Sequence, residues 1–327
     1  MKWLAIVAAF LPCCPQPALG SIDPALQQSL ISAMQRAELS HDQSMPYELD
    51  VDFVAQLNVP TRGHLTLKWG TKDHWRREVT LGPFEQVEVK NGEWHYTWRN
   101  ADFTPVRVGE LINLLSFGAG AENLVAKKEK RRVENGVEME CVETIRADYK
   151  KESPHEFCLS GVSNDILVNE WQDVPDEKKR EQFDNFVDFG AHRYPRKLEL
   201  LVNGSKAVTA DVVNLFSAPF DESLLRPPQG AISRRECEGL QHAVPKSAPE
   251  VSYPRSASDS GLMGDTTVAM TVLTDGSVAD IHLVGRSTRS MDDATLQTLK
   301  RWKFKPAMCG SEPVVTDITV VVSFRIN

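Results

Sequence analysis

Apolar and polar residues alternate in short runs through most of the chain, and this pattern predicts a β-rich protein. Between residues 47 and 98, turn signals such as Gly82-Pro83 and Asn91-Gly92 separate five alternating runs. Strands joined by such short turns pair as antiparallel neighbours. Large apolar side chains recur at alternate positions, as at Trp94 and Trp98, so one face of the sheet should be buried. The five predicted strands are 47–57, 64–69, 75–81, 84–90 and 94–98.

Two amphipathic helices are predicted beside these strands. Residues 24–39 repeat apolar side chains at helical spacing, and Asp23-Pro24 is typical of a helix start. Residues 106–117 also place apolar side chains along one helical stripe. A second series of alternating runs follows the second helix, with turns such as Asn135-Gly136 between them. The strands predicted in this series are 124–133, 137–145, 156–159, 166–170, 183–189, 197–202 and 207–215.

The pattern changes after residue 225. Proline and glycine interrupt any periodicity between 226 and 248, which predicts a linker. A strand–strand–helix–strand order then follows, with strands at 266–273, 278–284 and 314–326 and with Asp292 or Asp293 as the cap of the helix. We therefore expect an α+β protein with two domains. An antiparallel β-sheet domain with one or two helices spans 21–225, and a small ββαβ domain spans 249–327.

The first residues have the pattern of an export signal. Lys2 precedes nine apolar residues at 3–11, and Ala18-Leu19-Gly20 is a small-x-small cleavage pattern, so a cleavable signal peptide is predicted at 1–20. The apolar run is shorter than the roughly 20 residues of a membrane span. A lipoprotein signal at Cys13 or Cys14 is the alternative, but small residues do not precede them. We expect the mature chain in the periplasm, and tethering to the inner membrane is the less favoured outcome.

Composition and motifs exclude several classes of function. The chain has 327 residues, with 37 Lys and Arg against 45 Asp and Glu, and its formal net charge of −8 disfavours binding to nucleic acid. No GxSxG, HExxH, P-loop or GxGxxG motif occurs in the sequence. The cysteines form no CxxC pair, and no histidine lies at ligand spacing from them, which argues against a zinc site. We predict no catalytic residues, no cofactor and no metal.

Four cysteines remain after the predicted cleavage, and an even number in an exported protein favours disulfides. Four cysteines allow three pairings. Cys141 and Cys158 fall on neighbouring predicted strands, so this pair is favoured. Cys237 lies in the predicted linker and Cys309 in a turn of the last domain. They either form a bridge that holds the linker against that domain or remain as two free thiols.

Residues 249–327 resemble the C-terminal domain of the TonB family. The resemblance rests on Tyr253-Pro254, the Gly-x-x-Gly turn at 261–264, Asp275-Gly276, the run Trp-x-Phe-x-Pro-Ala at 302–307, and Gly-x-x-Pro-Val at 310–314. It implies a periplasmic, non-enzymatic module that recognises envelope or outer-membrane proteins and supports TonB-dependent transmembrane transport. Energy-transducing members carry a membrane anchor and a proline-rich spacer before this domain. Here a strand-rich region occupies that place, which argues against energy transduction.

The resemblance also implies where the partner binds. In the family, a segment of an outer-membrane transporter pairs with the last strand, and an edge strand offers the unpaired N–H and C=O groups that this needs. We expect the backbone of residues 316–323 to be the template. The alternative is that this strand is internal or self-paired in a homodimer. The residues expected along the binding edge are Val315, Thr316, Ile318, Val320, Val322 and Phe324.

The region 21–225 is similar to the LolA-like lipoprotein-carrier superfamily. The similarity rests on the strand–turn run 65–98, on Tyr194-Pro195-Arg196-Lys197-Leu198 followed by Asn203-Gly204, and on residues 215–220. It implies a curved half-barrel around an apolar cavity. The alternative function is therefore a carrier of a lipid or a lipidated peptide. The basic run 127–132 is either a docking patch or the solvated face of a strand.

Overall fold

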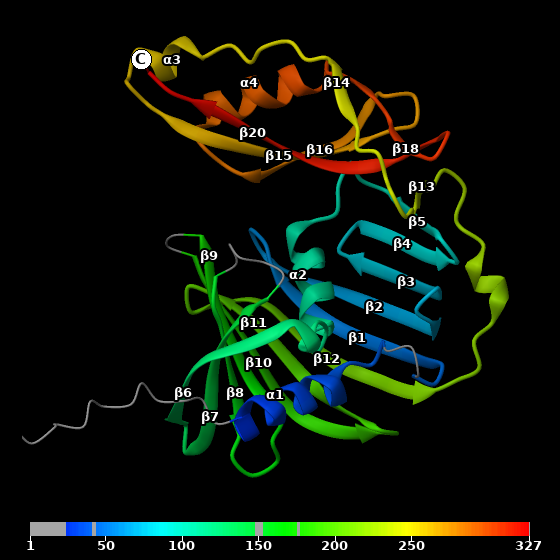
Figure 1. Ribbon diagram of the computed structural model, residues 1–327, viewed down its shortest axis with the longest axis vertical. Coiled ribbons are helices and arrows are strands. Elements are labelled where there is room, and N and C mark those ends of the chain that lie inside the picture. Colours follow the sequence, from blue (N-terminus) through cyan, green and yellow to red (C-terminus); the bar gives the residue numbers. More distant parts are fainter. Residues whose placement is uncertain (1–23, 41–43, 148–152, 175–176, 327) are drawn as a thin grey trace, which may run out of the picture.

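The computed structural model describes residues 24–40, 44–147, 153–174 and 177–326, and the predicted signal peptide lies outside these ranges. Two parts of the chain are visible in Figure 1: a large curved sheet with two helices, and a small domain above it. This confirms the predicted fold class. The strands of the large sheet are β1 (Tyr47–Gln56), β2 (Pro60–Thr71), β3 (His74–Leu81), β4 (Phe84–Asn91), β5 (Trp94–Arg99), β6 (Leu124–Glu134), β7 (Val137–Arg146), β8 (His155–Ser160), β9 (Ile166–Val174), β10 (Glu177–Phe189), β11 (His192–Val202), β12 (Ser205–Ser217) and β13 (Ile232–Arg235).

Strands β1 to β13 form one antiparallel sheet. Their order is β13-β5-β4-β3-β2-β1-β12-β11-β10-β9-β8-β7-β6. Short turns join most neighbours, and Gly92 and Gly136 have positive φ in two of these turns. The sheet ends are β13 on one side and β6 on the other. β12 joins the half of the sheet that contains β1 to β5 to the half that contains β6 to β11, because it pairs with β1 on one side and with β11 on the other.

Helices α1 (Pro24–Ala37) and α2 (Val106–Leu115) lie against one face of this sheet (Figure 1). Their apolar stripes bury Leu30 and Leu111, which join the aromatic and aliphatic side chains of the strands in one large core. The Tyr194 hydroxyl on β11 donates a 2.7 Å hydrogen bond to the carbonyl oxygen of Leu115. This bond ties the end of α2 to the middle of the sheet, and burial raises the pKa of Tyr194.

The same face of the sheet becomes polar towards β13. On β4, Phe84 contributes to the large core, and Gln86, Glu88 and Lys90 follow at every second position. Alternate residues of a strand share a face, so these three side chains continue the face that Phe84 begins. All three are nevertheless buried. The small domain covers this end of the sheet, as the contacts described below establish.

The small domain has the predicted ββαβ order. Strands β15 (Gly264–Val272), β16 (Val278–Gly285) and β20 (Thr316–Phe324) form a sheet in the order β16-β15-β20, and α4 (Arg289–Leu299) packs on one face of it (Figure 1). Its core contains Val268, Met270 and Leu299. The smaller elements are the helical turns η1 (Ala121–Asn123), η2 (Glu222–Leu225) and α3 (Arg255–Ser258), and the short strands β14 (Val244–Ser247), β17 (Lys303–Lys305), β18 (Ala307–Cys309) and β19 (Glu312–Val314).

Two sequence predictions need correction in detail. Residues 226–248 are more ordered than a linker, because β13 joins the large sheet and β14 pairs with β17. The N-cap of α4 is Thr288, whose hydroxyl oxygen accepts from the Met291 N–H, so neither Asp292 nor Asp293 caps the helix. Asp292 is instead buried in the first turn, where it accepts a 2.9 Å hydrogen bond from the Thr266 hydroxyl.

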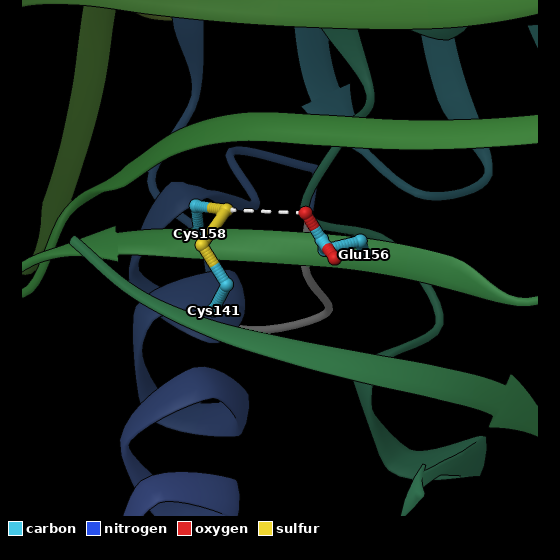
Figure 2. A group of neighbouring side chains, drawn as sticks. All are labelled: Cys141, Glu156 and Cys158. Atoms are coloured by element: carbon cyan, nitrogen blue, oxygen red, sulfur yellow. Dashed lines mark hydrogen bonds between the residues drawn. A yellow bond between two sulfur atoms is a disulfide. The ribbon is translucent and has the colours of Figure 1, made fainter. Parts of the chain in front are cut away.

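A disulfide joins Cys141 on β7 to Cys158 on β8, two residues that are directly opposite in the strand pairing (Figure 2). Both side chains are buried with Met139 and Val168 in a small cluster separate from the main core. In the chain-entropy model, a bridge that closes a 17-residue separation stabilises a protein by about 3 kcal/mol.

We expect the Cys141→Ser/Cys158→Ser variant to lose about 3 kcal/mol of unfolding free energy, because its unfolded chain regains the entropy that the bridge removes. Urea denaturation of the oxidised proteins measures this loss. An unchanged free energy of unfolding would show that the bridge does not constrain the unfolded chain.

Candidate functional site: the β20 edge and the domain junction

β20 is an edge strand of the small sheet. It pairs along its whole length with β15, from Gly264↔Phe324 to Val272↔Thr316. Among the described residues, no strand pairs with its other side. A nine-residue strand in this position has a row of backbone N–H and C=O groups directed away from the sheet.

The side chains of β20 alternate between the two faces of the sheet. Ile318 and Val320 pack on the domain core, and Val322 and Phe324 pack on a second small cluster. Thr316 is the first residue of β20, and Val315 precedes the strand. The residues predicted along the binding edge therefore contribute mainly their backbone to it, because their side chains face α4 or its flank.

The exposed face of β20 carries side chains that the sequence prediction left out. They are Asp317, Thr319, Val321 and Ser323, and Val321 is 58 % exposed. The period-two alternation of residues 316–324 is the signal that could have identified them. A strand that pairs with β20 would place every second side chain beside this exposed row.

The first part of β20 also takes part in the contact between the two domains. The Arg234 guanidinium on β13 donates to Asp317 through Nε at 2.8 Å and through Nη2 at 3.0 Å. Nη2 also donates to the Thr271 hydroxyl at 3.2 Å. Burial would raise the pKa of Asp317, but the hydrogen bonds and charge of Arg234 outweigh burial and hold that pKa below its usual value.

A second ion pair lies beside the first. Arg99 at the end of β5 contacts Asp280 on β16. Asp280 has a φ of 53°, in the left-handed region, at an irregularity in the pairing of β15 with β16. Next to it, the ring of His282 stacks on Phe103, with ring centroids 5.3 Å apart. The face of the small sheet that lies opposite α4 therefore packs against the polar end of the large sheet, through these ion pairs and this ring contact.

Both domains line a cavity of about 310 Å³ at this junction. Glu88 and His95 line it from the large sheet, and Met270 and Asp280 line it from the small one. Burial would raise the pKa of Glu88, but the charge of Arg77 and the hydrogen bond from His95 lower it to about 2. Every charged group named here already has a partner of opposite charge, so the junction is chemically suited to holding the domains together.

A separate cavity of about 280 Å³ lies under the two helices of the large domain. Its walls include Leu49, Leu65 and Ile112, and Arg77 and Ser116 add polar groups. This volume is at the lower end of the roughly 300–1,000 Å³ typical of small-molecule pockets.

The other candidate sites have structural roles. The basic run 127–132 lies on β6, the end strand of the sheet, where Lys130 pairs with Glu156 at 2.7 Å and charged residues discourage further strand pairing. Within the part of the chain that the structure describes, Cys141, Cys158 and Glu156 are the one group whose ligand atoms could reach a common metal ion (Figure 2). Both sulfurs are bonded to each other there, so neither is available as a thiolate ligand.

No helix in the described ranges is long and apolar enough to span a membrane. Comparison with known proteins gives a family for the small domain: residues 249–326 match the family model for the Gram-negative bacterial TonB protein C-terminal region. Protein TonB of Pseudomonas aeruginosa is 27 % identical over 101 residues, which are 31 % of this chain. The match spans only 28 % of the length of that curated relative.

Solved structures similar to each part of the chain are known. A LolA superfamily protein from Nitrosomonas europaea aligns with a TM-score of 0.44 and 10 % identity, covering 62 % of this chain and 97 % of its own. The C-terminal domain of Pseudomonas aeruginosa TonB aligns with a TM-score of 0.24 and 26 % identity, covering 27 % of this chain and 96 % of its own. Residues 249–326 thus match the C-terminal domain of TonB proteins, and the match is confined to the small domain.

Proposed function

We propose that this protein is a non-enzymatic recognition protein of the periplasm that binds an envelope or outer-membrane protein by strand addition to β20. The observation that carries the proposal is the position of β20, which pairs with β15 on one side and with no described strand on the other. Strand addition uses the backbone groups of such an edge for affinity and the adjacent side chains for specificity. Here Thr319, Val321 and Ser323 would supply that specificity.

Two further features support the proposed setting. The described residues contain two disulfides, which form and persist in oxidising compartments such as the periplasm. The family match at residues 249–326 supports a role in TonB-dependent transport across the outer membrane.

A pair of neighbouring proline variants tests the proposal. Successive N–H groups of a strand point to opposite edges, so one of Val320 and Val321 donates to β15 and the other points outward. We expect the proline at the outward N–H to leave the fold intact and to abolish partner binding, because it removes a donor that the incoming strand needs. Circular dichroism and thermal melting identify which variant is folded, and purification of the envelope partner with that variant measures binding.

The matched controls are Val320→Ala and Val321→Ala, which retain both N–H groups. They should bind the partner within a few-fold of the wild type. Equal binding by the folded proline variant and the wild type would argue against strand addition. A doubling of the molecular mass in solution that the same proline abolishes would instead point to self-pairing in a homodimer.

The second candidate function is that of a carrier for a lipid or a lipidated peptide. The cavity beneath α1 and α2 favours it, because Leu49, Leu65 and Ile112 offer an apolar wall. Ala119 is an exposed residue that lines this cavity, so Ala119→Trp should close the cavity and Ala119→Ser should not. Lipid that co-purifies with the wild type and the serine variant, but not with the tryptophan variant, would support the carrier function.

A further inference from the structure

The two disulfides of the described chain differ in their access to solvent. Cys141 and Cys158 are 1 % and 0 % exposed, within the small cluster on the large sheet. Cys237 and Cys309 are bonded to each other, and both are partly rather than fully buried. Thiol–disulfide exchange requires a thiolate to approach a sulfur atom directly, so access decides which disulfide an external reductant can attack.

The partly buried disulfide Cys237–Cys309 lies where the two domains are connected. Cys237 follows β13 by two residues, and Cys309 is the last residue of β18 in the small domain. With the disulfide intact, Cys237 is bonded to the small domain, and only Glu236 lies between it and the end of β13. Without the disulfide, the chain from 236 to 243 connects β13 to β14, and eight extended residues reach about 26–29 Å.

Other contacts also join the domains, and the Arg99–Asp280 pair among them is mostly buried, with side chains 11 % and 13 % exposed, whereas two further ion pairs are open to solvent. Arg234 pairs with Asp317 and Arg235 pairs with Glu312, and the side chains of these two acids are 59 % and 56 % exposed. Solvent-exposed ion pairs contribute little to stability, and salt screens them. One backbone bridge between Gln241 and Met308 also joins the connecting segment to β18. The disulfide is the covalent link between this segment and β18.

We propose that Cys237–Cys309 is a site of thiol–disulfide exchange for a dithiol reductant, and that its reduction releases the TonB C-terminal domain from the β13 end of the large sheet. One thiolate of the reductant attacks one sulfur and forms a mixed disulfide, and the other cysteine leaves as a thiolate that takes up a proton. The second thiol of the reductant then displaces the attached cysteine. The protein gains two thiols, and the reductant leaves as a disulfide.

Release would change the surroundings of β20. Asp317 is the second residue of β20, and Arg234 holds it against the large sheet. The remainder of the β20 edge is already unpaired within the described ranges. When the domains separate, the first part of the strand becomes accessible as well, so the whole edge is open to a partner. The inference does not depend on the identity of the partner, because both the reduction and the separation can be measured on the protein alone.

The first experiment measures the reduction of each disulfide in the folded, full-length protein. Dithiothreitol is added under native conditions, free thiols are trapped with iodoacetamide, and the modified peptides are quantified by mass spectrometry. We expect Cys237 and Cys309 to be modified at least roughly tenfold faster than Cys141 and Cys158, because buried bonds react only when the fold opens locally. Equal rates for the two pairs would overturn the proposal.

The second experiment measures the domain contact. After selective reduction, small-angle X-ray scattering should give a larger radius of gyration, and a glutamate-specific protease should cleave faster at Glu236 and Glu238. The Cys237→Ser/Cys309→Ser variant should show the larger radius of gyration and the faster cleavage without any reductant. The Cys141→Ser/Cys158→Ser variant should show both changes only after the reductant is added. A reduced protein that stays as compact and as resistant as the oxidised one would contradict the release. Circular dichroism verifies that both domains remain folded.

Discussion

The Arg77→Ala variant should lose about 3–5 kcal/mol of unfolding free energy at pH 7, because removing one partner leaves a buried charge uncompensated. Arg77 on β3 donates two hydrogen bonds to Glu88 on β4, at 2.8 and 2.6 Å. Glu88 is only 8 % exposed, and His95 Nε2 lies 3.3 Å from its carboxylate. Urea denaturation at pH 7 measures the loss.

The same pair predicts how the stability of the wild type depends on pH. The folded-state pKa of Glu88 is lowered from 4.5 to about 2, so Glu88 contributes stability above pH 4.5 that is lost as the pH falls towards 2. The shift of 4.5 − 2 = 2.5 units corresponds to about 3 kcal/mol. The Arg77→Ala/Glu88→Gln double variant is the control, and it should recover part of the loss because the uncompensated buried carboxylate is then absent. An Arg77→Ala protein as stable as the wild type would refute the buried pair.

Replacing Glu181 by glutamine should stabilise the protein at alkaline pH. Glu181 on β10 is buried, and its pKa is raised to about 7 because burial outweighs the hydrogen bond from Asn169 and the charge of Lys179. The folded state therefore holds a proton that the unfolded state releases near pH 4.5. The wild type loses stability as the pH rises from 4.5 to 7, by about 3 kcal/mol for a 2.5-unit shift.

We expect Glu181→Gln and the wild type to be nearly equal in stability at pH 4.5, and the variant to be more stable by up to about 3 kcal/mol at pH 8. The glutamine oxygen can still accept from the Asn169 amide. Thermal melting of both proteins across this pH range measures the difference. Glu122→Gln, at an exposed position, is the control and should leave the pH profile unchanged. A constant difference between Glu181→Gln and the wild type at every pH would contradict the buried proton.

Much of the fold could be predicted from local sequence because its turns and alternation are local signals. Asn91-Gly92 and Asn135-Gly136 mark hairpins that the structure contains. The start of β10 was missed, since residues 177–182 are all polar. They extend the strand because Arg180 bonds to Glu170 and Glu134 on other strands, which no local pattern reveals.

The sequence could predict the last strand but not which of its side chains are exposed. The last strand could be placed from the family resemblance, whereas the direction of its side chains depends on the helix that covers one face. The domain junction could not be predicted at all. Arg234 and Asp317 are 83 residues apart in sequence, and only the folding of both domains brings them together.

The most direct test of strand addition measures the register of the partner on β20. A photo-crosslinking amino acid is placed in turn at Thr319, Val321 and Ser323, with Val162 in an exposed turn of the large domain as the control. Paired strands align residue by residue, so the three β20 positions should crosslink to one partner segment at sites that shift by two residues each time. Crosslinks scattered over the partner, or equally strong crosslinks from Val162, would contradict recognition through β20.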